Sequence, residues 1–272
     1  MIKLIASDLD GTLLGRDFRF RPRTLAALES AAAAGIDVVF VTGRPHRWLD
    51  PLREQMEHDA FAICSNGAVL YHLGEDRVVA TELTDMKDVA AVHPTLAAEF
   101  PRASFTLETM ETVFIQGKYE YGPVLEGAQI VEGDFEEILK RPDGVVKYLM
   151  QVDGADPETL YGRTLPLVED HLALTIGIKG VPLMEMARKG MHKGKMLADF
   201  AAKRGVRASE VIAFGDMPND LEMLQWAGES YAMASGSPRL IEAIGKTCPA
   251  FDEDGVAQVI ERIVAEQGNL SA

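Results

Sequence analysis

Short apolar runs alternate with longer segments of helical spacing near the start of the chain. Strands are expected at residues 2–7, 36–41 and 61–64. The second of these is rich in β-branched and aromatic residues, which is typical of a strand buried in a parallel sheet. Helices are expected between the strands, at residues 23–34 and 46–58, and Gly35 is a favourable residue to end the first helix. This order of elements predicts a parallel sheet covered by helices.

The same order of strands and helices returns near the C-terminus, but in the middle of the chain the expected strands and helices do not alternate regularly. In the C-terminal part, strands are expected at residues 211–214 and 230–234, and helices at 193–204, 219–227, 238–244 and 256–266. In the middle, strands are expected at residues 105–107, 113–116, 145–152 and 172–178, and helices at 85–99, 134–140 and 157–165. The sequence therefore predicts an α/β protein whose Rossmann-like parallel-sheet core is formed by residues 1–82 and 188–272. Residues 83–187 are expected to form an inserted α+β domain with an antiparallel sheet.

The composition excludes several classes of protein. Of the 272 residues, 47% are hydrophobic and 25% are charged, which excludes a disordered chain. The 27 Lys and Arg against 42 Asp and Glu give a net charge of −15, which argues against nucleic-acid binding. No apolar run approaches the length of a membrane span, and the first apolar stretch is too short for a signal peptide. With only Cys64 and Cys248, neither a disulfide framework nor a thiolate metal site is expected, so we predict a cytoplasmic location.

The strongest chemical signal follows the first predicted strand. It reads Asp8-Leu9-Asp10-Gly11-Thr12. Carboxylates at positions i and i+2 share one face if the strand geometry continues, so both can point at one reacting centre, and Gly11 permits a sharp turn afterwards. Two neighbouring carboxylates can divide the work of nucleophile and acid, because each raises the pKa of the other. A calcium-binding loop is excluded, because its fifth and twelfth positions would fall on Thr12 and Arg19.

Two further segments follow predicted strands. Thr42-Gly43-Arg44 offers a hydroxyl and a backbone N–H to an anionic oxygen, although Thr42 is equally suited to capping a helix. Arg44 and Arg47 are either substrate contacts or surface charges. The segment at residues 215–220, Gly-Asp-Met-Pro-Asn-Asp, supplies carboxylate and amide oxygens that suit Mg²⁺. The structural alternative is that Asp216 and Asn219 only cap the next helix.

A lysine-rich segment precedes the predicted helix at residues 193–204. It reads Lys189-Gly190-Met191-His192-Lys193-Gly194-Lys195. Such lysines form either a solvated face or an ammonium contact with a phosphoryl oxygen.

Together, and in this order, the segments at residues 8–12, 42–44, 193–194 and 215–220 resemble the four motifs of haloacid dehalogenase-like hydrolases. The size and place of the insertion resemble the Cof-type subfamily, which has a large α+β cap of type IIB. Asn66-Gly67-Ala68 and residues 252–257 also match segments typical of that subfamily. The resemblance extends from residue 2 to about residue 264. One departure is that residues 232–238 lack the Gly-Asn-Ala that often follows the last core strand.

The resemblance implies a Mg²⁺-dependent phosphatase that acts on small phosphorylated metabolites through an aspartyl-phosphate. Asp8 is similar to the family's nucleophile, and Asp10 to the acid that protonates the leaving oxygen and then activates water. The metal ligands implied are Asp8, Asp216 and the backbone carbonyl of Asp10. Asp220 is expected to support the metal without binding it directly. Lys193 is chosen over Lys189 because Lys193-Gly194 followed by Leu197 matches the family pattern.

The resemblance also implies the groups that hold the phosphoryl oxygens, which are Thr42, the backbone N–H groups of Leu9 and Gly43, Lys193 and Asn219. The expected partner is a small-molecule phosphate ester, with neither nucleic acid nor membrane, and both a monomer and a homodimer are allowed. A phosphotransferase and a non-catalytic module that binds Mg²⁺ and phosphate are the alternatives. Polar residues of the insertion that are candidates for substrate specificity are Glu108, Glu111, Lys118, Tyr121, Lys147 and Lys179.

Overall fold

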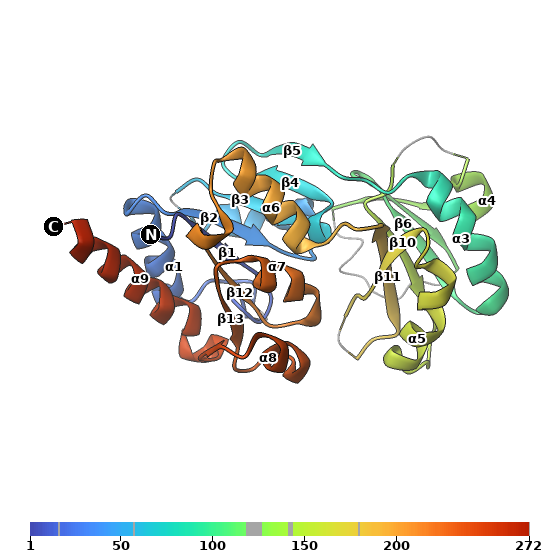
Figure 1. Cartoon of the computed structure of the whole chain (residues 1–272). Helices are drawn as coiled ribbons and strands as arrows, with labels where there is room; N and C mark the ends of the chain where they lie inside the picture. Colours follow the sequence, from blue (N-terminus) through green and yellow to red (C-terminus); the bar gives the residue numbers. More distant parts are fainter. Residues whose placement is uncertain (16, 57, 118–126, 141–143, 179, 272) are drawn as a thin grey trace. The chain divides into compact units, whose positions relative to one another are not determined.

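The chain divides into two compact units in the computed structural model (Figure 1). The first unit comprises Met1–Ala80 and His192–Ala272, and the second comprises Thr81–Met191. The structure describes residues 1–15, 17–56, 58–117, 127–140, 144–178 and 180–271. Within these residues, none of the helices combines the length and the apolar character needed to cross a membrane.

The first unit is built on an eight-stranded sheet with the order β14-β13-β12-β1-β2-β3-β4-β5. The strands are β1 (Leu4–Ser7), β2 (Asp37–Val41), β3 (Phe61–Cys64), β4 (Val69–His72), β5 (Arg77–Thr81), β12 (Val211–Gly215), β13 (Glu229–Met233) and β14 (Thr247–Cys248). The strands from β14 to β3 are parallel, and β4 runs antiparallel to β3. The central strand β1 is fully buried, and its carboxyl end lies between those of β2 and β12. Ligands of open parallel sheets bind at this edge.

Helices cover both faces of this sheet. They are α1 (Pro22–Ala33), α2 (Asp50–Arg53), α6 (Lys193–Lys203), α7 (Leu221–Trp226), α8 (Pro238–Ile244) and α9 (Gly255–Ser271). Helix α1 connects β1 to β2. Helices α6 and α7 belong to connections that run the opposite way along the sheet, α6 on the return from the second unit to β12 and α7 from β12 to β13. Right-handed crossovers in opposite directions place helices on opposite faces. Helix α9 packs beside α1, and α7 beside α6.

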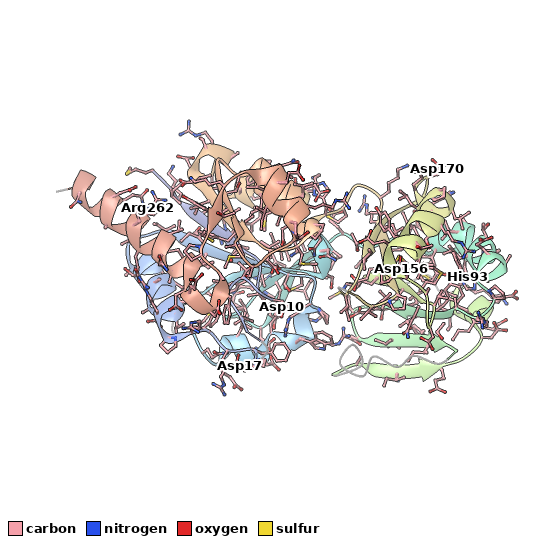
Figure 2. All side chains as sticks on the ribbon, turned by 90° about the horizontal axis from the view of Figure 1, so that it is seen from below. Asp10, Asp17, His93, Asp156, Asp170 and Arg262 are labelled. Carbon is pink, nitrogen blue, oxygen red and sulfur yellow. The ribbon has the colours of Figure 1, made fainter. Side chains whose placement is uncertain are left out.

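The second unit contains a six-stranded sheet with the order β10-β11-β9-β6-β7-β8. Its strands are β6 (Ser104–Glu108), β7 (Thr112–Gln116), β8 (Gln129–Glu132), β9 (Lys147–Gln151), β10 (Leu172–Ile176) and β11 (Leu183–Arg188). Alternate side chains of these strands pack with helices α3 (Met86–Glu99), α4 (Phe135–Ile138) and α5 (Pro157–Val168) in one apolar core. Figure 2 labels one polar member of this region, His93, whose ring nitrogen lies 2.7 Å from the Tyr148 hydroxyl.

The fold class is as predicted, a parallel-sheet α/β core with an inserted α+β domain. The helix expected at residues 46–58 is wrong. This segment forms a 3₁₀ turn at His46–Trp48 and the single turn of α2, because Pro51 cannot continue a helix that began before it. Strands β4, β5, β8, β11 and β14 were not predicted, and β8 pairs with β7 in parallel rather than antiparallel. Of these, β5, β8 and β14 are edge strands. Strand β4 is a buried strand of four residues, and so short an apolar run is ambiguous from periodicity alone.

Candidate active site

Asp8 lies directly after β1, where the sheet holds its backbone. Its N–H donates to the Phe214 carbonyl of β12 at 2.9 Å, and the residue is 5% exposed. The chain then turns sharply, with the backbone N–H groups of Leu13 and Leu14 donating to the Leu9 carbonyl. The side chain of Leu9 is fully buried, so only its backbone is available for the predicted contact with phosphate.

Gly11 is the residue at which this turn meets the loop after β12. It has a φ of +83°, and a Cβ atom there would lie 2.6 Å from Oδ2 of Asp216. A larger residue would therefore be both strained and in collision with a predicted metal ligand.

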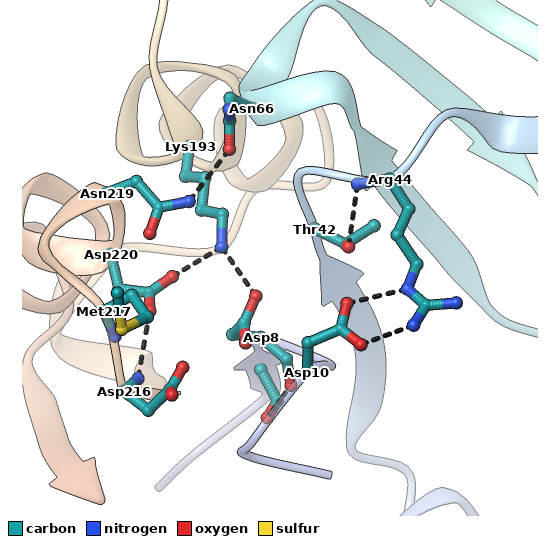
Figure 3. A network of polar contacts seen from close by, with 11 residues as sticks. Asp8, Asp10, Thr42, Arg44, Asn66, Lys193, Asp216, Met217, Asn219 and Asp220 are labelled. Carbon is teal, nitrogen blue, oxygen red and sulfur yellow. Dashed lines mark hydrogen bonds and ion pairs between the residues drawn. The ribbon is translucent and has the colours of Figure 1, made fainter. Parts of the chain in front are cut away.

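Lys193 brings two carboxylates together in the interior of the unit. It begins helix α6, whose first turn is capped by the His192 side chain. The Lys193 Nζ atom lies 2.6 Å from Asp8 Oδ1 and 2.6 Å from Asp220 Oδ1 (Figure 3). Burial lowers the pKa of this ammonium, but the two carboxylates outweigh it and keep the pKa of Lys193 above its ordinary value. The lysine is therefore a fixed positive charge beside the predicted nucleophile.

Asp220 uses its second oxygen to shape the loop after β12. Its Oδ2 atom accepts hydrogen bonds from the backbone N–H groups of Asp216 and Met217, both at 3.0 Å. Since Oδ1 already accepts from Lys193, both oxygens of this carboxylate have partners. The Asp220 carboxylate therefore connects Lys193 to the backbone of the loop after β12.

The remaining carboxylate of this cluster, Asp216, has an oxygen that lacks a partner. Its Oδ1 atom is buried and has no hydrogen-bond partner among the described residues. Burial, and next the charge of Asp220, raise the pKa of Asp216 to about 7. Burial likewise raises the pKa of Asp8 well above its usual range, against the opposing effect of Lys193.

The cluster has the composition of a cation site. Ligand oxygens of Asp8, Asp216 and Asp220 lie within 4.8 Å of one another, and Lys193 neutralises one of the three charges. Hard divalent cations such as Mg²⁺ bind carboxylate oxygens of this kind. The Asp216 oxygen that has no hydrogen-bond partner among the described residues is a donor of the kind that fits a dication.

Asp10 lies apart from this cluster and is paired with Arg44. The Arg44 guanidinium binds both carboxylate oxygens, with Nε 2.7 Å from Oδ2 and the second nitrogen 2.5 Å from Oδ1. Its carbon atom also lies 3.9 Å from the centre of the Phe18 ring. Figure 3 shows Asp8 directed toward Lys193 and Asp10 toward Arg44. The turn that follows Asp8 ends the strand alternation, so the two carboxylates point to different partners.

The Thr42 segment and Asn219 lie around the same centre (Figure 3). The buried Thr42 hydroxyl accepts a hydrogen bond from the Arg44 backbone N–H at 3.0 Å, so its own hydrogen can be donated to another acceptor. The Asn219 amide donates to Asn66 Oδ1 at 3.1 Å. The contact between Asn66 and Asn219 was not predicted, because Asn-Gly in a sequence by itself indicates only a turn.

In the second unit, Glu108 and Lys147 face each other across β6 and β9. Lys147 also forms a 2.9 Å ion pair with Glu185, which the sequence interpretation did not include. Glu111 is exposed. The three other predicted specificity residues, Lys118, Tyr121 and Lys179, lie outside the described residues.

Comparisons with known proteins agree with this fold and show the family. The sequence profile of the haloacid dehalogenase-like hydrolases matches residues 5–260, so the chain belongs to that family. The 5-amino-6-(5-phospho-D-ribitylamino)uracil phosphatase YitU of Bacillus subtilis is 27% identical over 95% of this chain and 96% of its own length. The pyridoxal phosphate phosphatase YbhA of Escherichia coli is 26% identical over 95% of this chain and 97% of its own length.

Solved structures give the same result. A phosphatase of this superfamily from Bacteroides thetaiotaomicron superimposes with a TM-score of 0.80 and 25% identity, over 96% of this chain and 95% of that protein. The matched relatives are phosphatases and the match spans both units, so the chain is a Cof-type phosphoric monoester hydrolase.

Proposed function

We propose that this protein is a Mg²⁺-dependent phosphatase that hydrolyses small phosphomonoesters through an aspartyl-phosphate on Asp8. The observation that carries the proposal is the cluster of three carboxylates, two of them buried and both paired with the ammonium of Lys193. A phosphate dianion approaching such a cluster would be repelled, unless a divalent cation offsets the excess of negative charge. A nucleophile, a fixed cation and a place for a metal ion therefore coincide at the end of β1.

In the first step, an oxygen of Asp8 forms a bond to phosphorus while the bond from phosphorus to the ester oxygen breaks. Asp10 donates a proton to the departing oxygen, which leaves as an alcohol. In the second step, Asp10 takes a proton from water as the water oxygen attacks phosphorus, and Asp8 is released. Arg44 holds Asp10 by two hydrogen bonds, so that the acid has a defined position in both steps.

The groups expected to hold the metal are the Asp8 and Asp216 carboxylates and the Asp10 backbone carbonyl. When bound, Mg²⁺ supplies positive charge that neutralises the phosphoryl oxygens and the carboxylates. The Asp216 oxygen that lacks a partner supports this assignment. Asp220, whose two carboxylate oxygens already accept hydrogen bonds, supports the loop after β12.

The groups expected to hold the phosphoryl oxygens are the Thr42 hydroxyl, the N–H groups of Leu9 and Gly43, Lys193 and Asn219. These donors come from four separate segments and need no covalent change during transfer. Positioning and charge neutralisation are what phosphoryl transfer requires.

The substrate class we propose is small phosphorylated metabolites, sugar phosphates or similar phosphomonoesters. Pyridoxal phosphate and a phosphoribitylamino-uracil, named for the two relatives, are esters of this kind, in which a phosphate is attached to a compact organic group.

The test is phosphate release from a panel of small phosphomonoesters, measured with Mg²⁺ and with excess chelator. Release by the wild type that requires Mg²⁺ and is lost in Asp8→Asn supports the proposal. The matched control is Glu242→Gln, which alters an exposed carboxylate of the same unit outside the motifs and should leave turnover unchanged. Release in excess chelator would overturn the metal dependence. If no ester releases phosphate while Mg²⁺ binds, a phosphotransferase or a non-catalytic phosphate-binding module is favoured instead.

A further inference from the structure

The turn between β3 and β4 has an unusual backbone. Ser65 and Asn66 have φ values of 51° and 55°, and Gly67 follows with 112°. Residues with a Cβ atom rarely adopt this left-handed region, and two in succession persist only where the surroundings hold them. Such outliers concentrate at functional sites, so the contacts of this turn are informative.

The turn is attached to the Thr42 segment by its backbone. The Ser65 N–H donates to the Arg44 carbonyl at 2.9 Å, and the Asn66 N–H donates to the Thr42 carbonyl at 3.0 Å. The Asn66 side chain also lies against Gly43, because a Cβ atom on Gly43 would be 3.3 Å from Asn66 Oδ1. The unusual conformation therefore places an amide group directly beside the proposed phosphate-binding segment.

The same amide contacts a second part of the site. Asn66 Oδ1 accepts the hydrogen bond from Asn219 Nδ2 at 3.1 Å (Figure 3). Asn219 belongs to the loop after β12 and is 153 residues away along the chain. A hydrogen bond from one N–H of a primary amide restricts the rotation of the amide group, and with it the direction of the second N–H.

We propose that Asn66 is a positioning residue of the phosphate site, which orients the Asn219 amide and aligns it with the Thr42 segment. This inference rests on the proposed function, in which Asn219 and Thr42 hold phosphoryl oxygens. Asn66 acts through Asn219 and needs no contact with the substrate. Its left-handed backbone is what allows one side chain to meet both loops.

The first variant is Asn66→Gly, because glycine adopts a positive φ without strain and removes only the amide. We expect the melting temperature to stay close to that of the wild type. The dissociation constant of inorganic phosphate in the presence of Mg²⁺ should rise about tenfold, and kcat/KM should fall at least as much, as is usual when the partner of an active-site ligand is lost. The control is Asp76→Gly, a change at another left-handed residue of the same unit, which should leave phosphate affinity unchanged.

A double-mutant cycle with Asn219→Ala separates positioning from a general weakening of the fold. If Asn66 acts through Asn219, Asn66→Gly has no further effect on phosphate affinity once Asn219 is replaced. If the two effects simply add, or if Asn66→Gly binds phosphate like the wild type, the proposed role is wrong. A wild type that neither binds inorganic phosphate nor hydrolyses any ester would instead contradict the proposed function itself.

Discussion

Replacing Asp216 by Asn should stabilise the metal-free protein, although it removes a proposed metal ligand. The oxygens of Asp216 lie in a cluster with those of Asp8 and Asp220, and Lys193 balances only one of the three charges. In the folded state the ionised form of Asp216 is therefore unfavourable, whereas in the unfolded chain water surrounds it. The amide of Asn has a similar shape and carries no charge.

The magnitude follows from the pKa of this group. The ordinary value is 3.8, and burial and neighbouring carboxylates raise it to about 7, a difference worth roughly 4 kcal/mol at about 1.4 kcal/mol per pKa unit. Because Asp216 keeps some contact with water, we expect about half of this, roughly 2 kcal/mol. A raised folded-state pKa gives stability that is present below 3.8 and is lost as the pH rises through about 7. The advantage of Asp216→Asn should therefore be larger at pH 8 than at pH 5.

The assay is urea unfolding in chelator at both pH values, followed by tryptophan fluorescence. The two tryptophans, Trp48 and Trp226, both belong to the first unit, so the signal reports the unit that contains Asp216. Adding Mg²⁺ should stabilise the wild type by about 2.7 kcal/mol at a hundred times the dissociation constant, and the variant by less. A variant less stable than the wild type at pH 8 in chelator, or equally stabilised by Mg²⁺, would refute this reasoning. Glu242→Gln, at an exposed residue of the same unit, is the control and should change neither quantity.

Two further predictions concern Arg44 and His93. Arg44→Lys loses the two parallel hydrogen bonds to the Asp10 carboxylate, so turnover of an alkyl phosphate should fall about tenfold. Turnover of p-nitrophenyl phosphate should fall less, because its leaving group needs little protonation. Equal losses for the two substrates would argue against the positioning of Asp10 by Arg44. Burial lowers the pKa of His93, so the second unit should lose stability as the pH falls below the ordinary histidine value of 6.5. Hydrogen exchange of peptides from residues 81–191 should show this loss in the wild type and not in His93→Gln. A loss of equal size in both proteins would assign the pH dependence to another group.

The positions of the main acidic motifs could be predicted because they follow strands with strong apolar signals. Strand β1 precedes Asp8 and β12 precedes Asp216, and parallel strands end at one edge of a sheet, although it was the family resemblance that joined the two motifs into one site. Lys193 was predicted from the same resemblance, because Lys193-Gly194 followed by Leu197 matches the family pattern. Its contacts with two carboxylates at 2.6 Å depend on where α6 begins relative to both strands, which no local pattern specifies.

The contacts of Asn66 and Arg44 could not be predicted from the sequence. Asn66 depends on a left-handed turn, and the sequence indicates a turn there without giving its backbone angles. Arg44 reaches Asp10 because β1 and β2 are neighbours in register, and the sequence alone left open whether this arginine was a surface charge. Both cases involve loops that are distant along the chain and meet only when the sheet has assembled.

The acidity of the whole chain and that of the site have different consequences. The net charge of −15 is spread over a surface that water and salt screen, so it says little about the substrate. In the cluster of Asp8, Asp216 and Asp220 such screening is weaker, and the one positive charge of Lys193, which pairs with Asp8 and Asp220, leaves an excess of negative charge. We expect a phosphatase built in this way to be inactive without a cation, and its free energy of unfolding to report metal binding in the absence of any substrate. Stability measurements with Mg²⁺ can thus test the metal site independently of the search for the substrate.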